Sequence, residues 1–340
     1  MDLGILTFPS PTGSADMARM AEGLGFHSMV FADTQCLTPD VWGQLMLAAA
    51  ATERIQIGTG VTNPVSRDPS VTASAALGLQ LASGGRVVLG IGRGDSSMAK
   101  IGRRPAPPAD FDLYLERLRA YLDGEEIPRE GHPSRIEWLA DCEVPHVPIE
   151  VAATGPKVIE IAARRADRIC FAVGADTERL GDCIERARRA AEKADRDPDA
   201  LRYGAFVNCV IHPDREVARE AIRGGLSVFA HFSGFQGMDI DSLPEGAREA
   251  ARQMRTGYDM ANHAVGSGAH AQSLAADFIH RFGVAGPLEE AITRFEEIRD
   301  AGIDFVRVVP GSRDMPREVA STSMPGLGKV ATALATEAPA

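Results

Sequence analysis

The sequence predicts a (β/α)8 TIM barrel, and three observations lead to this fold. Eight short apolar segments rich in Val and Ile alternate with segments of helical length, as expected for a parallel sheet covered by helices. Many of the 34 glycines fall where these apolar segments end. The chain has 340 residues, and α/β barrels run from about 200 to over 400 residues. A doubly wound sheet would need a glycine-rich phosphate loop after the first strand, where the chain reads PSPTGS.

Turn and capping signals place the elements in order along the chain. Strands end in Gly, Pro or polar residues, and helices begin at capping residues or at a first-turn proline. Ser14 is expected to cap the first helix. The expected strands are 3–8, 28–32, 55–61, 86–92, 149–153, 168–173, 203–211 and 305–309. The expected helices are 14–23, 39–51, 69–81, 110–122, 157–165, 176–194 and 287–301, with a last one from Ser321.

Two tracts are longer than a barrel connection requires. The first, about 97–148, follows the fourth strand, and its Pro- and Glu-rich part at 124–146 is expected to be irregular. The second, about 214–282, follows the seventh strand and is expected to be mostly helical. The chain has no internal repeat, linker or low-complexity segment. We therefore expect one domain over 1–340, with insertions after strands 4 and 7.

The composition limits the partners that the protein can have. A net charge of −11 argues against binding to nucleic acid or to an anionic membrane. No stretch approaches the roughly 20 apolar residues of a membrane span, and no signal peptide is visible at the N-terminus. The five cysteines lack CxxC spacing, and the histidines form no HExxH or other metal motif. We expect reduced thiols, a cytoplasmic location and no metal.

The segment 55–97 is expected to form the centre of the functional site. It reads as strand, helix and strand, and both strands should deliver their glycine-rich ends to the same edge of the sheet. Ligands of α/β folds bind beyond the carboxyl ends of the strands. The expected site residues are Gly60, Val61, Thr62 and Asn63 after the first strand, and Arg93, Gly94, Asp95 and Ser96 after the second.

Each of these motifs has a functional and a purely structural interpretation. The run GIGRGDSS is either a phosphate cradle, because glycines let backbone N–H groups approach an anion, or a tight barrel turn. Thr154 and Gly155 either bind the other side of a cofactor or form an ordinary strand-to-helix turn. Asp33 and Asp95 either exchange a proton or hold a ring N–H, or cap a helix. His212, His231 and His263 could each meet a substrate, although a surface or core position is the more usual reason for a histidine.

Four separated segments resemble the bacterial luciferase-like superfamily, in the right order and over nearly the whole chain. They are GTGVTNPVSRDPSVTASA, SGGRVVLGIGRGDS, VAATGPKVIEIAARRAD and GPLEEAITRFEEIRDAGID. Within the superfamily the chain is most similar to the coenzyme F420-dependent oxidoreductases, a branch that includes the methylenetetrahydromethanopterin reductases. This resemblance implies a TIM barrel, a homodimer and F420 as the cofactor. Members that use FMN share the same segments, so FMN is the alternative.

The resemblance also implies roles for individual residues. The Gly60–Val61 bond matches a non-prolyl cis peptide that forms a bulge behind the (deaza)flavin ring, and Asp33 matches an acidic residue of the family. Thr34 stands where the sugar-phosphate dehydrogenases have a histidine, which argues against a sugar-phosphate substrate. The ring contact after the bulge matches Asn63, and the contacts after the fourth strand match Arg93, Gly94, Asp95 and Met98. The phosphate-side contacts match Thr154, Gly155, Lys157 and Val158.

Three functions remain open from the sequence. The first is an F420-dependent oxidoreductase that transfers a hydride to or from a small organic substrate, with Asp33 or Asp95 as the proton partner. The second is an FMN-dependent monooxygenase served by a separate cofactor reductase. The third is a non-catalytic cofactor-binding protein, against which the glycines and both aspartates argue. The two long tracts are expected to line the substrate pocket.

Overall fold

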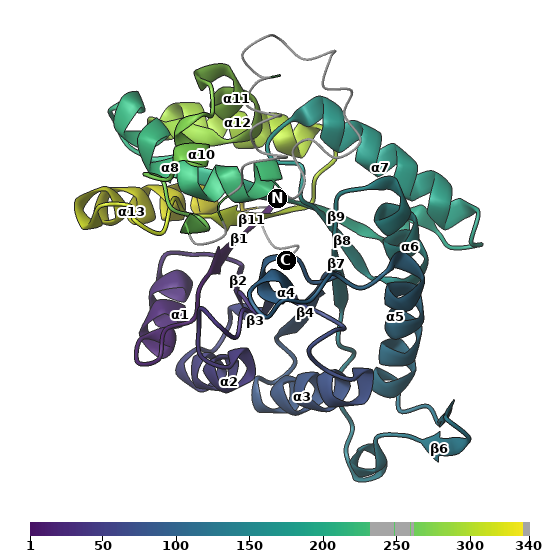
Figure 1. Cartoon of the computed structure of the whole chain (residues 1–340). Coiled ribbons are helices and arrows are strands. Elements are labelled where there is room, and N and C mark those ends of the chain that lie inside the picture. Colours follow the sequence, from purple (N-terminus) through teal and green to yellow (C-terminus); the bar gives the residue numbers. More distant parts are fainter. Residues whose placement is uncertain (232–247, 249–258, 260–261, 336–340) are drawn as a thin grey trace.

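Eight parallel strands close into a barrel in the part of the chain that the computed structural model describes, residues 1–231, 248, 259 and 262–335 (Figure 1). Each strand pairs with its neighbour in parallel, and the ring closes where the last strand pairs with the first and β8 pairs with β9. The predicted fold class is confirmed. In ring order the strands are β1 (Asp2–Thr7), β2 (Ser28–Phe31), β3 (Gln56–Thr62), β4 (Val87–Ile91), β7 (Ile149–Ala153), β8 (Arg168–Phe171), β9 (Arg202–Ile211) and β11 (Phe305–Val309).

Helices surround this ring on the outside (Figure 1). The main hydrophobic core lies between the strands and the helices, and a smaller apolar cluster built on Cys170, Phe206 and Phe305 fills the barrel interior. The surrounding helices are α1 (Ser14–Gly23), α2 (Val41–Ala51), α3 (Pro69–Ala82), α5 (Pro108–Leu122), α6 (Pro156–Arg165), α7 (Thr177–Glu192), α8 (Arg215–Phe229), α12 (Leu288–Asp300) and α13 (Arg317–Leu334).

Aspartate caps begin several of the helices. The Asp40 carboxylate accepts the backbone N–H groups of Trp42 and Gly43 at α2, each at 3.1 Å, and Asp68 accepts that of Ser70 at α3 at 2.9 Å. Such caps satisfy N–H groups that have no partner within the helix. The prediction that Ser14 caps α1 is wrong, because its hydroxyl bonds the backbone of the preceding turn at Ser10.

The first long tract is more ordered than the sequence suggested. Residues 124–146 contain an antiparallel hairpin of β5 (Ile127–Arg129) and β6 (His132–Ser134), followed by the 3-10 helix η1 (Glu137–Asp141). Glu130 and Gly131 both have positive φ, at 49° and 85°, as in the mirror-image turns that suit hairpins. Strands of three residues are too short to show an alternating pattern, so the prediction of an irregular tract was wrong.

The second long tract begins with a helix of the barrel itself, because α8 packs against β9. The tract ends in the short helices α10 (Ala269–Gln272) and α11 (Ala276–Phe282). The helical prediction for 232–247, 249–258 and 260–261 lies outside the described residues. An unpredicted strand, β10 (Val284–Gly286), pairs in parallel with β9, and α13 begins at Arg317 rather than Ser321.

A buried ion pair lies in the amino-terminal half of the barrel interior. Arg307 of β11 donates from Nε to Glu150 Oε1 at 3.0 Å and from Nη2 to Oε2 at 2.5 Å, and it also bonds the Ser28 hydroxyl. Both charged side chains are 2% exposed. Gly4 leaves room for this pair, because a Cβ there would lie 2.7 Å from Arg307 Nη1. Together these residues form what we call the base of the barrel.

Candidate active site

A cavity of about 880 Å³ lies at the carboxyl ends of the barrel strands. Its floor is formed by side chains of the barrel interior, among them Val61 and Phe206. Its walls come from loops after six strands and from α8, so segments far apart in sequence meet there. Other residues of the cavity lining are Pro9, Asp33, Thr34, Gly60, Thr62, Gly92, Arg93, Gly94, Asp95, Ser96, Thr154, Gly155, Lys157, Val158, Gly225, His263, Pro310, Ser312 and Arg313.

The end of β3 forms an irregular part of the floor. The Gly60–Val61 peptide is cis, at the position that the resemblance indicated. The pairing of β3 with β4 shifts register between Thr59 and Thr62. A Cβ on Gly60 would lie 2.6 Å from Val30 Cγ2, and one on Gly92 would lie 3.0 Å from Val61 Cγ2. The two glycines therefore allow the backbone of neighbouring strands to approach closely at this point.

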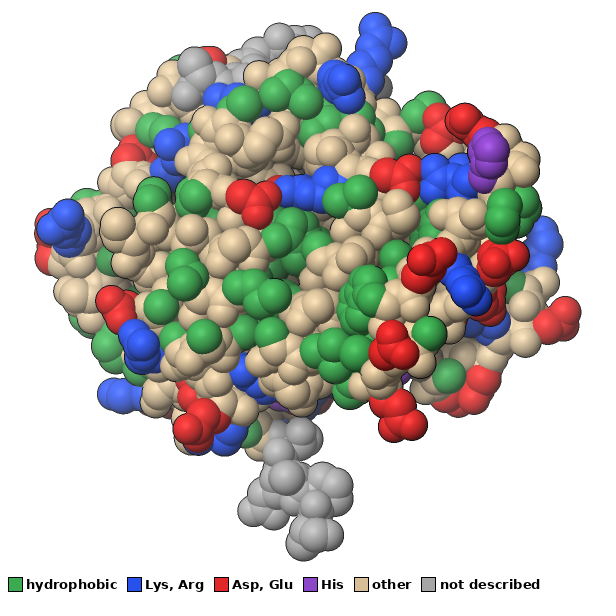
Figure 2. All heavy atoms as spheres, turned by 90° about the horizontal axis from the view of Figure 1, so that it is seen from below, with side chains coloured by type: hydrophobic (Ala, Val, Ile, Leu, Met, Phe, Trp, Pro, Cys, Tyr) green, Lys and Arg blue, Asp and Glu red, His purple; other side chains and the backbone are tan. Residues whose placement is uncertain are grey.

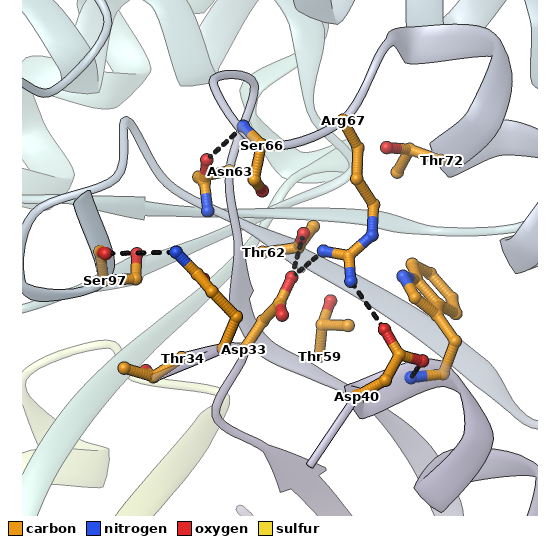
Figure 3. Close-up of polar contacts among 12 residues, drawn as sticks. Asp33, Thr34, Asp40, Thr59, Thr62, Asn63, Ser66, Arg67, Thr72 and Ser97 are labelled. Carbon is orange, nitrogen blue, oxygen red and sulfur yellow. Dashed lines mark hydrogen bonds and ion pairs between the residues drawn. The ribbon is translucent and has the colours of Figure 1, made fainter. Parts of the chain in front are cut away.

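Asp33 is the centre of a polar network at the end of β2 (Figure 3). Its Oδ2 accepts the Thr62 hydroxyl at 2.7 Å and also binds Nη1 of Arg67. The Asp33 side chain is 3% exposed. Arg67 extends the network by donating from Nη2 to Asp40 Oδ2 at 2.8 Å. Asp33 is therefore an ion-paired carboxylate at the cavity wall, and the helix-capping interpretation does not apply to it.

Asp95 lies across from this network, in the loop after β4. Its side chain is exposed to the cavity, and the enclosing protein raises its pKa above the ordinary value, while the charges of Arg93 and His231 act in the opposite direction. It precedes the short helix α4 (Ser96–Ala99) without accepting a capping hydrogen bond from that helix. Arg93 is anchored by a 2.6 Å bond from Nε to the Ala106 carbonyl. The loop thus presents to the cavity a carboxylate that accepts no hydrogen bond from the described part of the chain.

Asn63 and Met98 lie behind this loop and are not part of the cavity lining. A Cβ on Gly94, whose φ is +88°, would lie 3.0 Å from Asn63 Cβ and 2.9 Å from Met98 Cγ, so the two side chains pack under Gly94. Asn63 Oδ1 accepts the N–H groups of Val65 and Ser66 at 3.0 Å. Its buried Nδ2 has no hydrogen-bond partner within the described chain. This donor is available to a ligand only if the loop moves or the ligand reaches behind it.

The start of α6 forms another wall. Gly155 precedes the helix without a side-chain cap, and Pro156 occupies the first turn. A helix start carries N–H groups without internal partners and a partial positive charge, and Lys157 adds a full charge beside it. Together with Arg93 and Arg313, Lys157 gives the lining three cations, against Asp95 and the ion-paired Asp33. This balance suits an anionic ligand, although the whole chain is acidic.

Sequence reasoning missed several contributors to the site. Arg67 stands in an ordinary strand-to-helix loop, and no local pattern marks its contact with Asp33. Gln35 bridges two walls by donating from Nε2 to the Ser97 carbonyl at 3.2 Å. The PGSRD run after β11 resembles the other strand ends and could have been included on that ground.

The loop after β11 holds residues 263–266 beside the cavity through hydrogen bonds. The Arg313 N–H donates to the Ala264 carbonyl at 2.8 Å, and the Asp314 carboxylate accepts the Gly266 N–H at 2.6 Å. These bonds place the buried His263 at the cavity wall. Burial and the charges of Lys100 and Arg313 lower its pKa to about 4, so the imidazole is neutral near pH 7.

The described residues contain no group of three or more His, Cys, Asp or Glu side chains arranged to hold a metal ion. Within the same residues, no helix combines the length and the apolar character needed to cross a bilayer.

The chain thus combines a parallel barrel, a cavity at the carboxyl ends of the strands and a register shift at the end of β3. Residues 5–304 match the family model of the luciferase-like monooxygenases, so the chain is a member of that family.

Particular relatives have reductase or dehydrogenase names. The 5,10-methylenetetrahydromethanopterin reductase of Archaeoglobus fulgidus is 28% identical over 312 residues, which cover 91% of this chain and 92% of that protein. The F420-dependent hydroxymycolic acid dehydrogenase of Mycobacterium tuberculosis is 31% identical over 225 residues, 60% of each chain. The F420-dependent tetrahydromethanopterin reductase of Methanopyrus kandleri shares the fold, with a TM-score of 0.76 at 23% identity over 96% of this chain and 97% of that one.

Proposed function

We propose that the protein is an F420-dependent oxidoreductase that transfers a hydride between the cofactor and a small organic substrate. The observation that carries the proposal is the single cavity in which the ends of β2, β3, β4 and β7 meet. Family membership and the F420-dependent dehydrogenase among the relatives support the same cofactor. A cavity of about 880 Å³ is at the upper end of the range for cofactor sites, which is roughly 300–1,000 Å³.

The residues present fit a deazaflavin with a phosphorylated tail. The irregular β3 end at Gly60 and Val61, together with Gly92, lines the cavity with two glycines and one apolar side chain. Arg93 and Gly94 would contact the ring from the β4 side, with Asn63 and Met98 supporting them from behind. Thr154, Gly155, Lys157 and Val158 would hold the phosphate side, where the helix start and the lysine supply positive charge. Bound there, F420 supplies the hydride chemistry.

We assign the proton transfer to Asp95. Its carboxylate faces the cavity, and its raised pKa brings it closer to the range in which an acid and its base exchange readily. Asp95 would accept the proton of the substrate group that is oxidised and would return it in the reverse reaction, while the bound cofactor would supply the hydride chemistry. Asp33 has one oxygen bound to Thr62 and Arg67. It is better placed to orient a ligand in the cavity than to exchange a proton.

Calorimetric titration of the purified protein with F420 and, separately, with FMN tests the proposal. We expect binding of F420 and much weaker binding of FMN. Binding of FMN alone would favour a monooxygenase served by a separate reductase, a function that the family's description also admits. Binding of neither cofactor would favour a non-catalytic role.

We also propose that the protein is a homodimer that pairs through α2 and α3. Neither helix contains a charged residue, yet Leu47 and Val71 are 51% and 55% exposed. Both helices lie at the bottom of Figure 1, and the view from below in Figure 2 has hydrophobic side chains across the middle and charged ones around them. Contiguous exposed apolar faces mark association surfaces.

Sedimentation analysis of Leu47→Glu tests the dimer. We expect the wild-type protein to be dimeric and the variant to be monomeric. The matched control is Leu113→Glu on α5, where the leucine is 45% exposed outside this face, and it should stay dimeric. A monomeric wild-type protein would refute the proposal.

The five cysteines are free thiols, which fits the reducing cytoplasm as the compartment.

A further inference from the structure

Arg67 connects the cavity wall to a helix cap without lining the cavity itself. It lies in the loop between β3 and α3, and its side chain is 17% exposed. One end of the guanidinium binds the buried Asp33, and the other binds Asp40 at 2.8 Å. Asp40 is 63% exposed and caps α2. A guanidinium that bridges two carboxylates in this way is held in one orientation, because its donors form a rigid planar fork.

The two oxygens of Asp33 have different roles. Both donors that reach the carboxylate, the Thr62 hydroxyl and Arg67, bind Oδ2 (Figure 3). Within the described residues, no donor binds Oδ1. Asp33 lines the cavity. One oxygen therefore anchors the carboxylate to the protein, and the other is left for a group inside the cavity.

A second arginine shows what a purely structural contact of this kind looks like. Arg129 of β5 binds Asp68, the cap of α3, from Nη2 at 2.7 Å, much as Arg67 binds the cap of α2. Neither Arg129 nor Asp68 lines the cavity. The two arginines therefore share the helix-cap contact, and only Arg67 adds a contact with a residue of the cavity wall.

We propose that Arg67 is a positioning residue that fixes the Asp33 carboxylate, so that Oδ1 accepts a hydrogen bond from an N–H or O–H group of the ligand in the cavity. The inference rests on the proposed function, because it assumes that F420 occupies the cavity. Without Arg67 the carboxylate keeps only the Thr62 bond and can rotate about its Cβ–Cγ bond. It also loses its cationic partner in a buried place, which leaves an uncompensated charge there.

Affinity for F420, measured by calorimetry, provides the main test. We expect Arg67→Met to bind F420 at least about tenfold more weakly, the range for losing a hydrogen bond to a charged group. Arg67→Lys keeps the charge without the fork, and it should recover part of the affinity. In an Asp33→Ala background, Arg67→Met should cause no further loss, because no carboxylate remains to be positioned. Arg129→Met is the matched control and should bind F420 as the wild type does.

Equal affinity of the Arg67→Met and wild-type proteins would overturn the inference, and so would equal losses in the Arg67→Met and Arg129→Met proteins. Crystal structures of the ligand-free wild type and Arg67→Met provide a readout that does not depend on F420. We expect the Asp33 carboxylate to turn away from its wild-type orientation in the variant, and an unchanged orientation would overturn the inference. If the wild type binds no F420, the proposed function fails, while these structures still test the positioning.

Discussion

Two carboxylate–guanidinium pairs lie at opposite ends of the barrel. They differ in how many of the carboxylate oxygens are hydrogen-bonded within the protein. At the base, both oxygens of Glu150 are bonded to Arg307, and the pair is closed off from solvent. At the cavity, Asp33 uses one oxygen for both Arg67 and Thr62. The base pair has no acceptor left to offer a ligand, whereas the cavity pair does.

The difference indicates that the base pair serves the fold, whereas the cavity pair serves ligand binding. Buried ion pairs must have their remaining bonds satisfied, because an uncompensated charge in the interior is costly. The base meets this requirement through contacts within the protein, including the Ser28 hydroxyl and the Phe305 ring, whose centroid lies 5.1 Å from the Arg307 guanidinium carbon. The cavity meets it only in part, as expected where a ligand completes the set.

Arg307→Met should have the largest effect, because it breaks the base. Removing one partner of a buried pair costs about 3–5 kcal/mol, and we expect the free energy of unfolding in urea to fall by about that amount. Adding Glu150→Leu removes the stranded carboxylate and should restore part of the loss. A double variant no more stable than Arg307→Met would show that the base does not depend on this charge balance.

Protonation of His263, which lies at the cavity wall, should have the next largest effect on the free energy of unfolding. The unfolded chain binds this proton near pH 6.5, whereas the folded chain does so only near pH 4. Stability should therefore be complete above pH 6.5 and fall by up to about 3 kcal/mol as the pH drops toward 4. When the free energy of unfolding in urea is plotted against pH across this range, the slope should be smaller for His263→Gln than for the wild type. His132→Gln, in the exposed hairpin, should keep the wild-type slope; equal slopes for the wild-type, His263→Gln and His132→Gln proteins would contradict the assignment.

Gly4→Ala tests whether a change confined to the base lowers stability without affecting the cavity. The new Cβ would lie 2.2 Å from Ser28 Oγ and 2.7 Å from Arg307 Nη1, and overpacking of this kind costs about 1–3 kcal/mol. We expect a lower free energy of unfolding in urea and unchanged affinity for F420 in calorimetry. Gly181→Ala in α7 is the control and should lose neither stability nor affinity, because no atom lies within 4 Å of its added Cβ and it does not line the cavity. A loss of F420 affinity in Gly4→Ala would mean that base and cavity are coupled.

Asp95→Asn should have the smallest effect on stability, and in the opposite direction. Because the folded chain raises the pKa of Asp95, ionising this carboxyl as the pH rises past its ordinary range costs stability. The variant should therefore be slightly more stable than the wild type at neutral pH, by less than about 1 kcal/mol since the side chain is partly solvated. The gain should vanish in acid, where the carboxyl is protonated in both states. Urea unfolding at neutral and acidic pH checks this, and a variant less stable at neutral pH would contradict it.

The predicted site agrees with the cavity where it depended on strand ends. Gly60, Asp95 and Thr154 were placed together because parallel strands deliver their carboxyl ends to one edge, and all three line the cavity. The position of Asn63 could not be derived in this way, because its side chain turns behind Gly94. Whether a residue next to a strand end faces the cavity depends on the backbone of the loop, which local sequence patterns do not specify.

Taken alone, the sequence determined the order of strands and helices, because the alternation of apolar segments with amphipathic ones reflects burial on two faces or on one. It also determined which loops carry glycine and acidic residues. Only the tertiary structure decided which charges pair, because Glu150 and Arg307 are 157 positions apart and Asp33 and Arg67 are 34 apart. Such pairs depend on the closing of the ring and the path of a loop, and neither leaves a local pattern in the chain.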